Sequence, residues 1–87
     1  MDKLNFRKRD GMIVKDMGEE TVLYDQEANQ VHSLNATAAL IYNLCDGYRG
    51  LGDIVGEMLS RFNIDEKTAR RDVERILSEL KEKGILR

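Results

Sequence analysis

The spacing of apolar residues along the chain changes between its first and second parts. From residue 11 to residue 34, three short stretches rich in branched and aromatic residues are separated by polar connections. Short extended stretches of this kind, joined by polar turns, are typical of an antiparallel β-meander. The pattern therefore predicts three strands, over Met12–Val14, Thr21–Tyr24 and Val31–Leu34.

After residue 34 the apolar residues follow the spacing of an α-helix. The first helix is predicted to begin after Asn35, whose side chain can accept a hydrogen bond from a free backbone N–H of the first turn. It is predicted to end at Asp46-Gly47, where glycine can adopt the left-handed conformation of a helix C-terminus. Four residues are predicted to share one face of this helix: Thr37, Leu40, Ile41 and Leu44.

Two further helices are predicted in the remaining chain. The third begins after the N-cap Asp65, runs to Lys83 and is ended by Gly84, with Ile85-Leu86 returning to the core. The apolar residues of the second helix fall within about one third of its circumference: Leu51, Ile54, Val55, Met58, Leu59 and Phe62. The apolar stripe of the third helix consists of Ala69, Val73, Ile76, Leu77 and Leu80.

Strands that precede the helices, without alternating with them, indicate an α+β fold with an N-terminal three-stranded antiparallel sheet followed by three helices. The 87 residues are expected to form one domain over residues 1–87. Residues 1–10 are expected to be a flexible tail, because chain ends usually are solvated. Such a small sheet leaves an open edge, here along Val31–Leu34, which must be protected or used.

Composition excludes several classes of protein. Apolar residues make up 41% and charged residues 34% of the chain, which indicates a globular domain and not a disordered one. The longest apolar run, Ala38–Ile41, is far too short for a transmembrane helix, and the N-terminus lacks a signal peptide. We therefore expect a cytoplasmic protein that has no membrane partner.

The charge of the chain is unevenly distributed. The net charge is −2, but residues 1–15 carry five basic residues against two acidic ones. Residues 16–35 carry five acidic residues and no Lys or Arg. A nearly neutral domain without a basic stripe is a poor candidate for binding nucleic acid.

The residue types that catalysis needs are mostly missing. With one Cys and one His, the chain cannot build a zinc site, and it has no glycine-rich phosphate-binding loop. Cys45 ends the first helix near its apolar face and is expected to be a core thiol. His32 lies in mid-strand and is expected at the surface, with no acidic neighbour in sequence to orient it as a general base. We expect no enzymatic activity and no cofactor.

Taken together, several segments of the chain resemble the PqqD family. The resemblance covers about residues 7–87, and its most distinctive parts are Leu34–Ala38 and Asp46-Gly47. It also rests on Val22–Asp25, Val31–Ser33, Ile41, Tyr48-Arg49, Ile54-Val55, Phe62, Asp72–Leu80 and Gly84–Leu86. The chain departs from the family pattern at Gly50-Leu51-Gly52, where Ser or Thr commonly opens the second helix. The loop Gln26–Gln30 looks more like the broad PqqD-like set than like dedicated members of the pyrroloquinoline quinone (PQQ) biosynthesis pathway.

The resemblance implies a peptide-recognition element of ribosomal peptide modification. Such domains bind the leader of a precursor peptide and present it to a modifying enzyme, often a radical SAM protein. The implied fold is a three-stranded sheet on a winged-helix-like trio of helices. The leader is implied to add as an extra strand beside the third strand and to pack against the third helix.

The residues agree with this mode of binding. An added strand gains affinity from main-chain hydrogen bonds and specificity from side-chain pockets. On the third helix, Leu77 lies off the centre of the apolar stripe, and Arg70, Glu74 and Lys81 follow on the same flank. An alternative is that this flank is only a solvated rim beside a core leucine. The predicted peptide-binding residues are Val31, His32, Ser33, Leu34, Arg70, Val73, Glu74, Leu77 and Lys81.

Two other functions stay open from the sequence. The second and third helices, with Thr68, Arg70, Arg71 and Arg75, could form the helix-turn-helix of a winged-helix DNA-binding regulator. The acidic residues of the third helix oppose phosphate binding. A small enzyme is opposed by the missing catalytic residues. An exposed strand edge can also pair with a second copy and give a homodimer.

Overall fold

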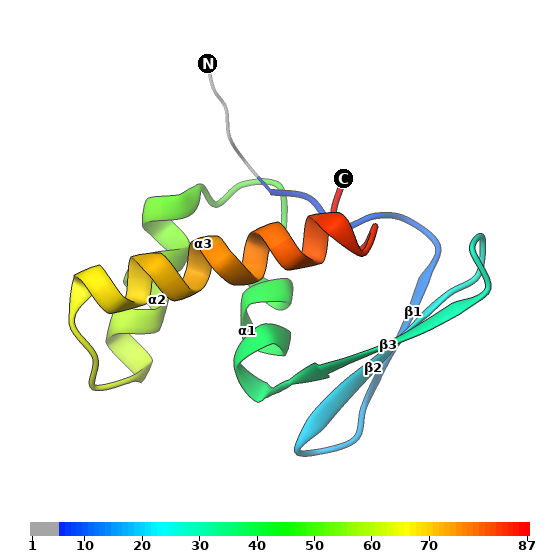
Figure 1. Ribbon diagram of the computed structural model, residues 1–87, viewed down its shortest axis with the longest axis horizontal. Coiled ribbons are helices and arrows are strands. Elements are labelled where there is room, and N and C mark those ends of the chain that lie inside the picture. The colour runs from blue at the N-terminus through cyan, green and yellow to red at the C-terminus, as the bar shows by residue number, and fades with distance from the viewer. Residues whose placement is uncertain (1–5) are drawn as a thin grey trace.

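The computed structural model describes residues 6–87 and contains three strands followed by three helices (Figure 1). This confirms the predicted α+β class and the order of the elements. The strands are β1 (Met12–Asp16), β2 (Glu20–Asp25) and β3 (Gln30–Asn35), each longer than predicted by two residues. The helices are α1 (Ala36–Leu44), α2 (Leu51–Arg61) and α3 (Glu66–Glu82).

The three strands form one antiparallel sheet in the order β1-β2-β3, so β1 and β3 are its two edges. In the centre of the sheet, Leu23 of β2 lies opposite His32 of β3. Alternate residues of β2 are buried on the face that packs against the helices: Thr21, Leu23 and Asp25. Side chains at the positions between them point to the opposite face, which we call the outer face.

Polar side chains fix the ends of the predicted helices. The Asn35 side chain accepts a hydrogen bond from the backbone N–H of Ala38 at 2.8 Å, which confirms its predicted capping role. Asp65 likewise accepts a hydrogen bond from the backbone N–H of Thr68 at 2.7 Å. Gly84, at a φ of +77°, follows the end of α3 and turns the chain back toward the core.

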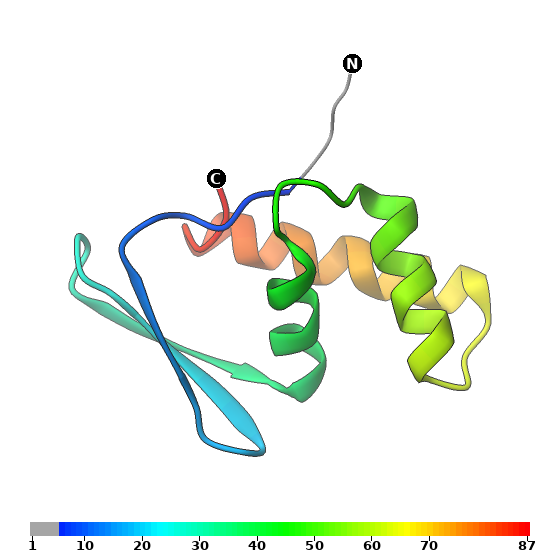
Figure 2. The same cartoon turned by 180° about the vertical axis from the view of Figure 1, so that it is seen from behind.

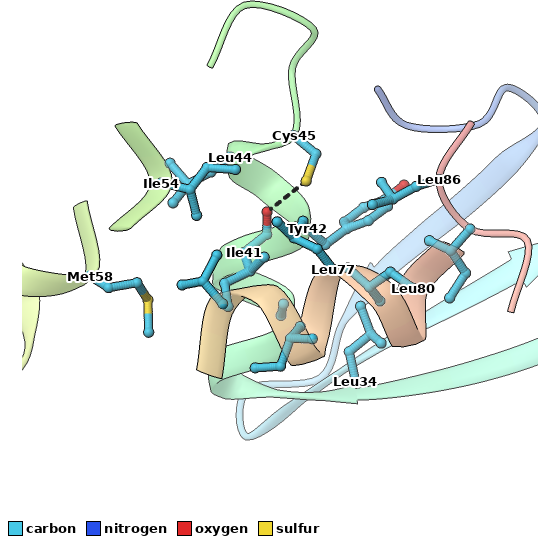
Figure 3. Close-up of a cluster of buried hydrophobic side chains, with 14 of the residues drawn as sticks. Leu34, Ile41, Tyr42, Leu44, Cys45, Ile54, Met58, Leu77, Leu80 and Leu86 are labelled. Carbon is cyan, nitrogen blue, oxygen red and sulfur yellow. Dashed lines mark hydrogen bonds between the residues drawn. The ribbon is translucent and has the colours of Figure 1, made fainter. Parts of the chain in front are cut away.

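The core lies where α1 meets the sheet, α2 and α3 (Figure 3). The predicted shared face of α1 is only partly buried, because Ile41 and Leu44 are buried whereas Thr37 and Leu40 are half-buried. Ala39 and Tyr42, which lie outside that predicted face, are buried as well. Apolar residues surround most of this short helix, so its sequence defines the buried direction weakly. Phe62 also departs from its prediction, since it lies one residue beyond the end of α2 and is 41% exposed.

The segment before β1 runs alongside the C-terminal end of the chain (Figures 1 and 2). The backbone N–H of Arg9 donates to the Ile85 carbonyl and that of Arg87 to the Arg7 carbonyl, each at 2.9 Å. The N–H of Gly47 donates to the Phe6 carbonyl at 2.8 Å. The prediction of a flexible tail over residues 1–10 is therefore wrong for residues 6–9, which join the fold through these contacts. Residues 1–5 of that predicted tail lie outside the described residues.

None of the helices within residues 6–87 combines the length and the apolar character needed to cross a lipid bilayer.

Candidate functional site

The open edge of β3 offers main-chain hydrogen-bonding groups. The N–H of Gln26 donates to the carbonyl of Gly11, which places the main-chain groups of Gln26 on the β1 side of β2. Main-chain N–H and C=O groups point alternately to the two sides of a strand, so the groups of Leu23 face β3. His32 lies opposite Leu23, and its main-chain groups therefore face β2. The N–H and C=O groups of Val31 and Ser33 consequently point away from the sheet, along its open edge.

The side chains of β3 divide between the two faces of the sheet. Leu34 is buried against the helices, whereas Val31 lies on the outer face and is 66% exposed. His32 shares the inner face with Leu34 and is half-buried, which differs from its predicted surface position. Its Nε2 atom is buried and has no hydrogen-bond partner among residues 6–87. The strand therefore combines an accessible backbone edge with an inner face that is only partly sealed.

One flank of α3 faces away from β3. Leu77 of this flank lines a shallow depression together with Phe6, which precedes β1, and Leu51, which begins α2. The depression also includes Glu74, Ser78 and Lys81. In Figures 1 and 2, the segment that begins at residue 6 and the α1–α2 connection lie above α3, and the junction of β3 with α1 lies below it. This flank is thus separated from the β3 edge by the body of the helix.

The opposite flank of α3 faces the end of β3. Asp72 lines a second depression with Thr37, which lies two residues after the end of β3. Met58, Phe62 and Ile64 complete its lining. On a helix with 100° per residue, Glu79 and Lys83 lie within about 20° of Asp72, and Ile76 within about 40°. We call this side, from Asp72 to Lys83, the β3-side flank.

The structure does not bring all the predicted peptide-binding residues together. Val31 to Leu34 lie on the β3 edge, but Glu74, Leu77 and Lys81 line the depression beside Phe6. Arg70 lies within about 20° of Lys81 around the helix, on the same flank, and its side chain forms an ion pair with Glu66 at 3.7 Å. Val73 is completely buried in the core, so its side chain is closed to any ligand in this structure.

The residues that line the depression nearest β3 were missed from the sequence. Thr37 and Asp72 are half-buried, and both Phe62 and Ile64 are exposed although they are large and apolar. The pair Phe62 and Ile64 on either side of Asn63, in a short connection between helices, was the available signal. It was not used because Phe62 fitted the apolar stripe of the second helix.

The described residues contain one cysteine, which is buried. Burial raises the pKa of the Cys45 thiol to about 12, so this nucleophile stays protonated near neutral pH. Its Sγ donates a hydrogen bond to the Ile41 carbonyl at 3.2 Å inside the core (Figure 3), which confirms the predicted core thiol. Within residues 6–87, no three His, Cys, Asp or Glu side chains gather closely enough to hold a metal ion.

Comparisons with known proteins give a family and a fold. The model of a family described as "Coenzyme PQQ synthesis protein D (PqqD)" matches residues 20–86. A solved structure described as "Lasso peptide synthetase B1 complexed with the leader peptide" is 28% identical with a TM-score of 0.83, over 95% of this chain and 98% of that one. A second, "TbiB1 in Complex with the TbiA(beta) Leader Peptide", is 22% identical with a TM-score of 0.82, over 92% and 93% of the two chains. No curated protein matches the chain.

Proposed function

The chain belongs to the PqqD family, and we propose that it binds the leader of a ribosomally made precursor peptide and presents it to a modifying enzyme. A similar structure that is 28% identical over 95% of this chain is described as a complex with a leader peptide. We extend the proposal to the type of enzyme, a radical SAM protein, because the enzymes served by the family that the chain resembles are often of this type. The chain itself acts as a single recognition domain and supplies no catalytic group.

The observation that carries this proposal is the open edge of β3. Val31 and Ser33 direct their free N–H and C=O groups along this edge, and an extended peptide would pair with them as a fourth strand. Main-chain pairing alone supplies affinity without sequence preference. Specificity therefore requires side-chain contacts next to the strand.

The β3-side flank of α3 provides a surface for such contacts. Beyond the end of β3, the depression at Thr37 contains the exposed apolar side chains of Phe62 and Ile64. A peptide that leaves the β3 edge toward α1 would reach these side chains, which suit an apolar anchor residue. Glu79 and Lys83, farther along the same flank, are exposed charges that can orient the peptide. This proposal moves the expected side-chain contacts of α3 from Arg70, Glu74, Leu77 and Lys81 to its opposite flank.

The DNA-binding alternative receives no support. Neither the family match nor the similar structures concern a DNA-binding protein. Two of the arginines that a recognition helix would use are paired on α3 itself, Arg70 with Glu66 at 3.7 Å and Arg75 with Glu79 at 3.2 Å. The acidic partners of both arginines would repel phosphate groups.

A titration with the leader peptide tests the location of the site. The probe is a cognate leader peptide, added to isotopically labelled protein. We expect the largest backbone amide shifts at residues 31–34 and from Asp72 to Lys83. Shifts that cluster instead around Phe6, Leu51 and Leu77 would place the peptide on the flank of α3 that carries Leu77, which we call the far flank. That result would contradict strand addition at β3.

Two charge reversals on α3 give a matched comparison. Glu79→Lys alters the β3-side flank and Glu74→Lys the far flank, and both glutamates are exposed on the same helix. An exposed charge pair contributes about 0.2–1 kcal/mol, so Glu79→Lys should change the leader affinity by about 1.5- to 5-fold. Glu74→Lys should leave it unchanged. The reverse result would return the peptide to the flank that carries Leu77.

A further inference from the structure

The edge of the sheet opposite β3 is open as well. β1 is the second edge strand, and all of its residues except Met12 are exposed. The carbonyl of Gly11 faces β2, so the alternation along the strand turns the main-chain groups of Met12, Val14 and Asp16 away from β2. Within residues 6–87, these groups have no hydrogen-bond partner on that side. β1 therefore presents a row of unpaired donors and acceptors along its edge.

Most of the features that protect an edge strand from pairing are missing in β1. Its register with β2 continues without a bulge from Met12 to Asp16, and the chain contains no proline. Apolar side chains are exposed on both faces, since Ile13 on the outer face is 51% and Val14 on the inner face 49% exposed. The helices gather beside the end of β3 in Figures 1 and 2, and the exposure of Val14 shows that they leave this part of the inner face uncovered. A regular, uncovered edge of this kind is a template for another strand.

The main chain of β1 is self-complementary when two copies align antiparallel about Val14. Val14 then lies opposite Val14 of the second copy, and Met12 lies opposite Asp16, so every main-chain group that faces the edge finds a partner within the two strands. A register shifted by two residues leaves the groups of either Met12 or Asp16 without a partner in the other strand. One of these two shifts also sets Lys15 directly opposite Lys15. The register about Val14 therefore gives the most complete set of hydrogen bonds.

The side chains of β1 agree with this register. On the inner face, the two Val14 side chains would lie about 4.5–5.5 Å apart at their Cβ atoms and cover each other. On the outer face, Lys15 would lie opposite Ile13 of the second copy, which its aliphatic stem can cover while its ammonium group stays in water. No like charges stand directly opposite each other, and the two Lys15 side chains are diagonal neighbours that can point apart into solvent. Two-fold symmetry supplies each of these contacts twice, whereas an unrelated strand would have to match both faces independently.

We propose that a second copy of the chain occupies the β1 edge, so that two sheets join through β1 into one continuous antiparallel sheet. Only one strand of each copy takes part, so the buried area is small and the dimer is weak, forming at high protein concentration. The two β3 edges become the outer borders of the joined sheet and stay open. The dimer itself does not depend on the proposed function, but together with it gives one assembly that holds two leader peptides.

Opposite charges at residue 14 test the register, because a two-fold pairing about Val14 sets this residue against itself. Val14→Lys and Val14→Glu each place like charges across the axis and should raise the dimer dissociation constant, measured by sedimentation equilibrium, at least about tenfold. An equal mixture of the two variants sets a lysine opposite a glutamate and should recover most of this loss, which also shows that both variants are folded. Val14→Thr, which keeps the branched shape without a charge, should stay within about threefold of the unaltered chain.

Charges at residue 13 give an independent test on the outer face. In the register about Val14, residue 13 lies opposite Lys15 of the second copy. Ile13→Glu should therefore keep or strengthen the dimer, and Ile13→Lys should weaken it. A register shifted so that residue 13 faces itself would make both variants weaken the dimer, and this result would overturn the proposed pairing.

Several other results would overturn the inference. One is a chain that stays monomeric at every soluble concentration, and another is a mixture of Val14→Lys and Val14→Glu that associates no better than either variant alone. A dimer that Ser33→Pro dissociates and Val14→Lys does not would place the contact at the β3 edge. Binding of a cognate leader is the separate readout, and Val14→Lys should retain it within about twofold. Failure of the unaltered chain to bind the leader would refute the proposed function and leave the dimer standing.

Discussion

Replacing Ser33 by proline separates peptide binding from folding. The main-chain N–H of Ser33 faces the open edge of β3, so the fold does not need it as a donor. Proline lacks this N–H and is tolerated where the group faces solvent. His32 is the matched neighbour, because its N–H faces β2 inside the sheet. The two substitutions should therefore give opposite results.

The size of each effect follows from the main-chain groups that are lost. In Ser33→Pro, the added strand loses one hydrogen bond and keeps an unpaired carbonyl, which together cost about 2–3 kcal/mol. The leader affinity should fall about 30- to 160-fold, while the free energy of unfolding changes by less than about 1 kcal/mol. His32→Pro breaks the same kind of bond within the sheet, so the loss of about 2–3 kcal/mol should appear in the unfolding of the free protein.

Urea denaturation and calorimetric titration with the leader measure the two quantities. Val14→Pro is the control on β1, the other edge of the sheet. The carbonyl of Gly11 faces β2, and main-chain groups alternate along the strand, so the N–H of Val14 faces solvent. It should leave both folding and leader binding nearly unchanged. Strand addition at β3 is refuted if Ser33→Pro binds the leader normally, and an effect of Val14→Pro alone would place the peptide on β1.

Three further predictions concern the caps and the core. Asn35→Ala should lower the free energy of unfolding by about 1 kcal/mol in chemical denaturation, because the first turn of α1 loses its cap; an unchanged midpoint would contradict the capping role. Hydrogen bonds from the backbone and hydroxyl of Thr68, together with the nearby Arg71 charge, hold the pKa of Asp65 below its ordinary value. The ionised Asp65 carboxylate therefore stabilises the fold above about pH 4, and this effect is lost as the pH falls through the lower pKa of the folded state. The free energy of unfolding of Asp65→Asn should consequently change less with pH in the acid range than that of the unaltered protein. The Cys45 thiol, with a pKa of about 12, should react with a thiol reagent at pH 8 only when the protein unfolds, and rapid labelling of the native protein would contradict its burial.

Local sequence signals were sufficient to predict the elements and their ends. Asn35 and Asp65 cap their helices, and Gly84 follows the end of α3, as each residue type suggests. These features depend on contacts within a few residues, which a sequence displays directly. The three strands were likewise predicted from short apolar stretches and the polar turns between them, which are local features of the sequence.

Features that depend on distant contacts were not predictable in the same way. The helical periodicity placed Leu77 and Asp72 on opposite flanks of α3 but gave no information on which flank faces β3. That rotation is set by the packing of α3 against α1 and α2. The pairing of Arg7 and Arg9 with the other end of the chain has no local pattern at all, so those residues were taken for a tail.

The junction between residues 6–9 and residues 84–87 has a consequence for the order of folding. Arg9 donates its side chain to the Gly84 carbonyl across a separation of 75 residues, and its backbone to Ile85. Closing so long a loop carries a larger entropy loss than forming the hairpins or helices between its ends. We therefore expect the β3 edge and α1, which are adjacent in the chain, to form before this junction locks the two halves together. The amide proton of Arg9 should then report, by its hydrogen exchange, the final step of assembly.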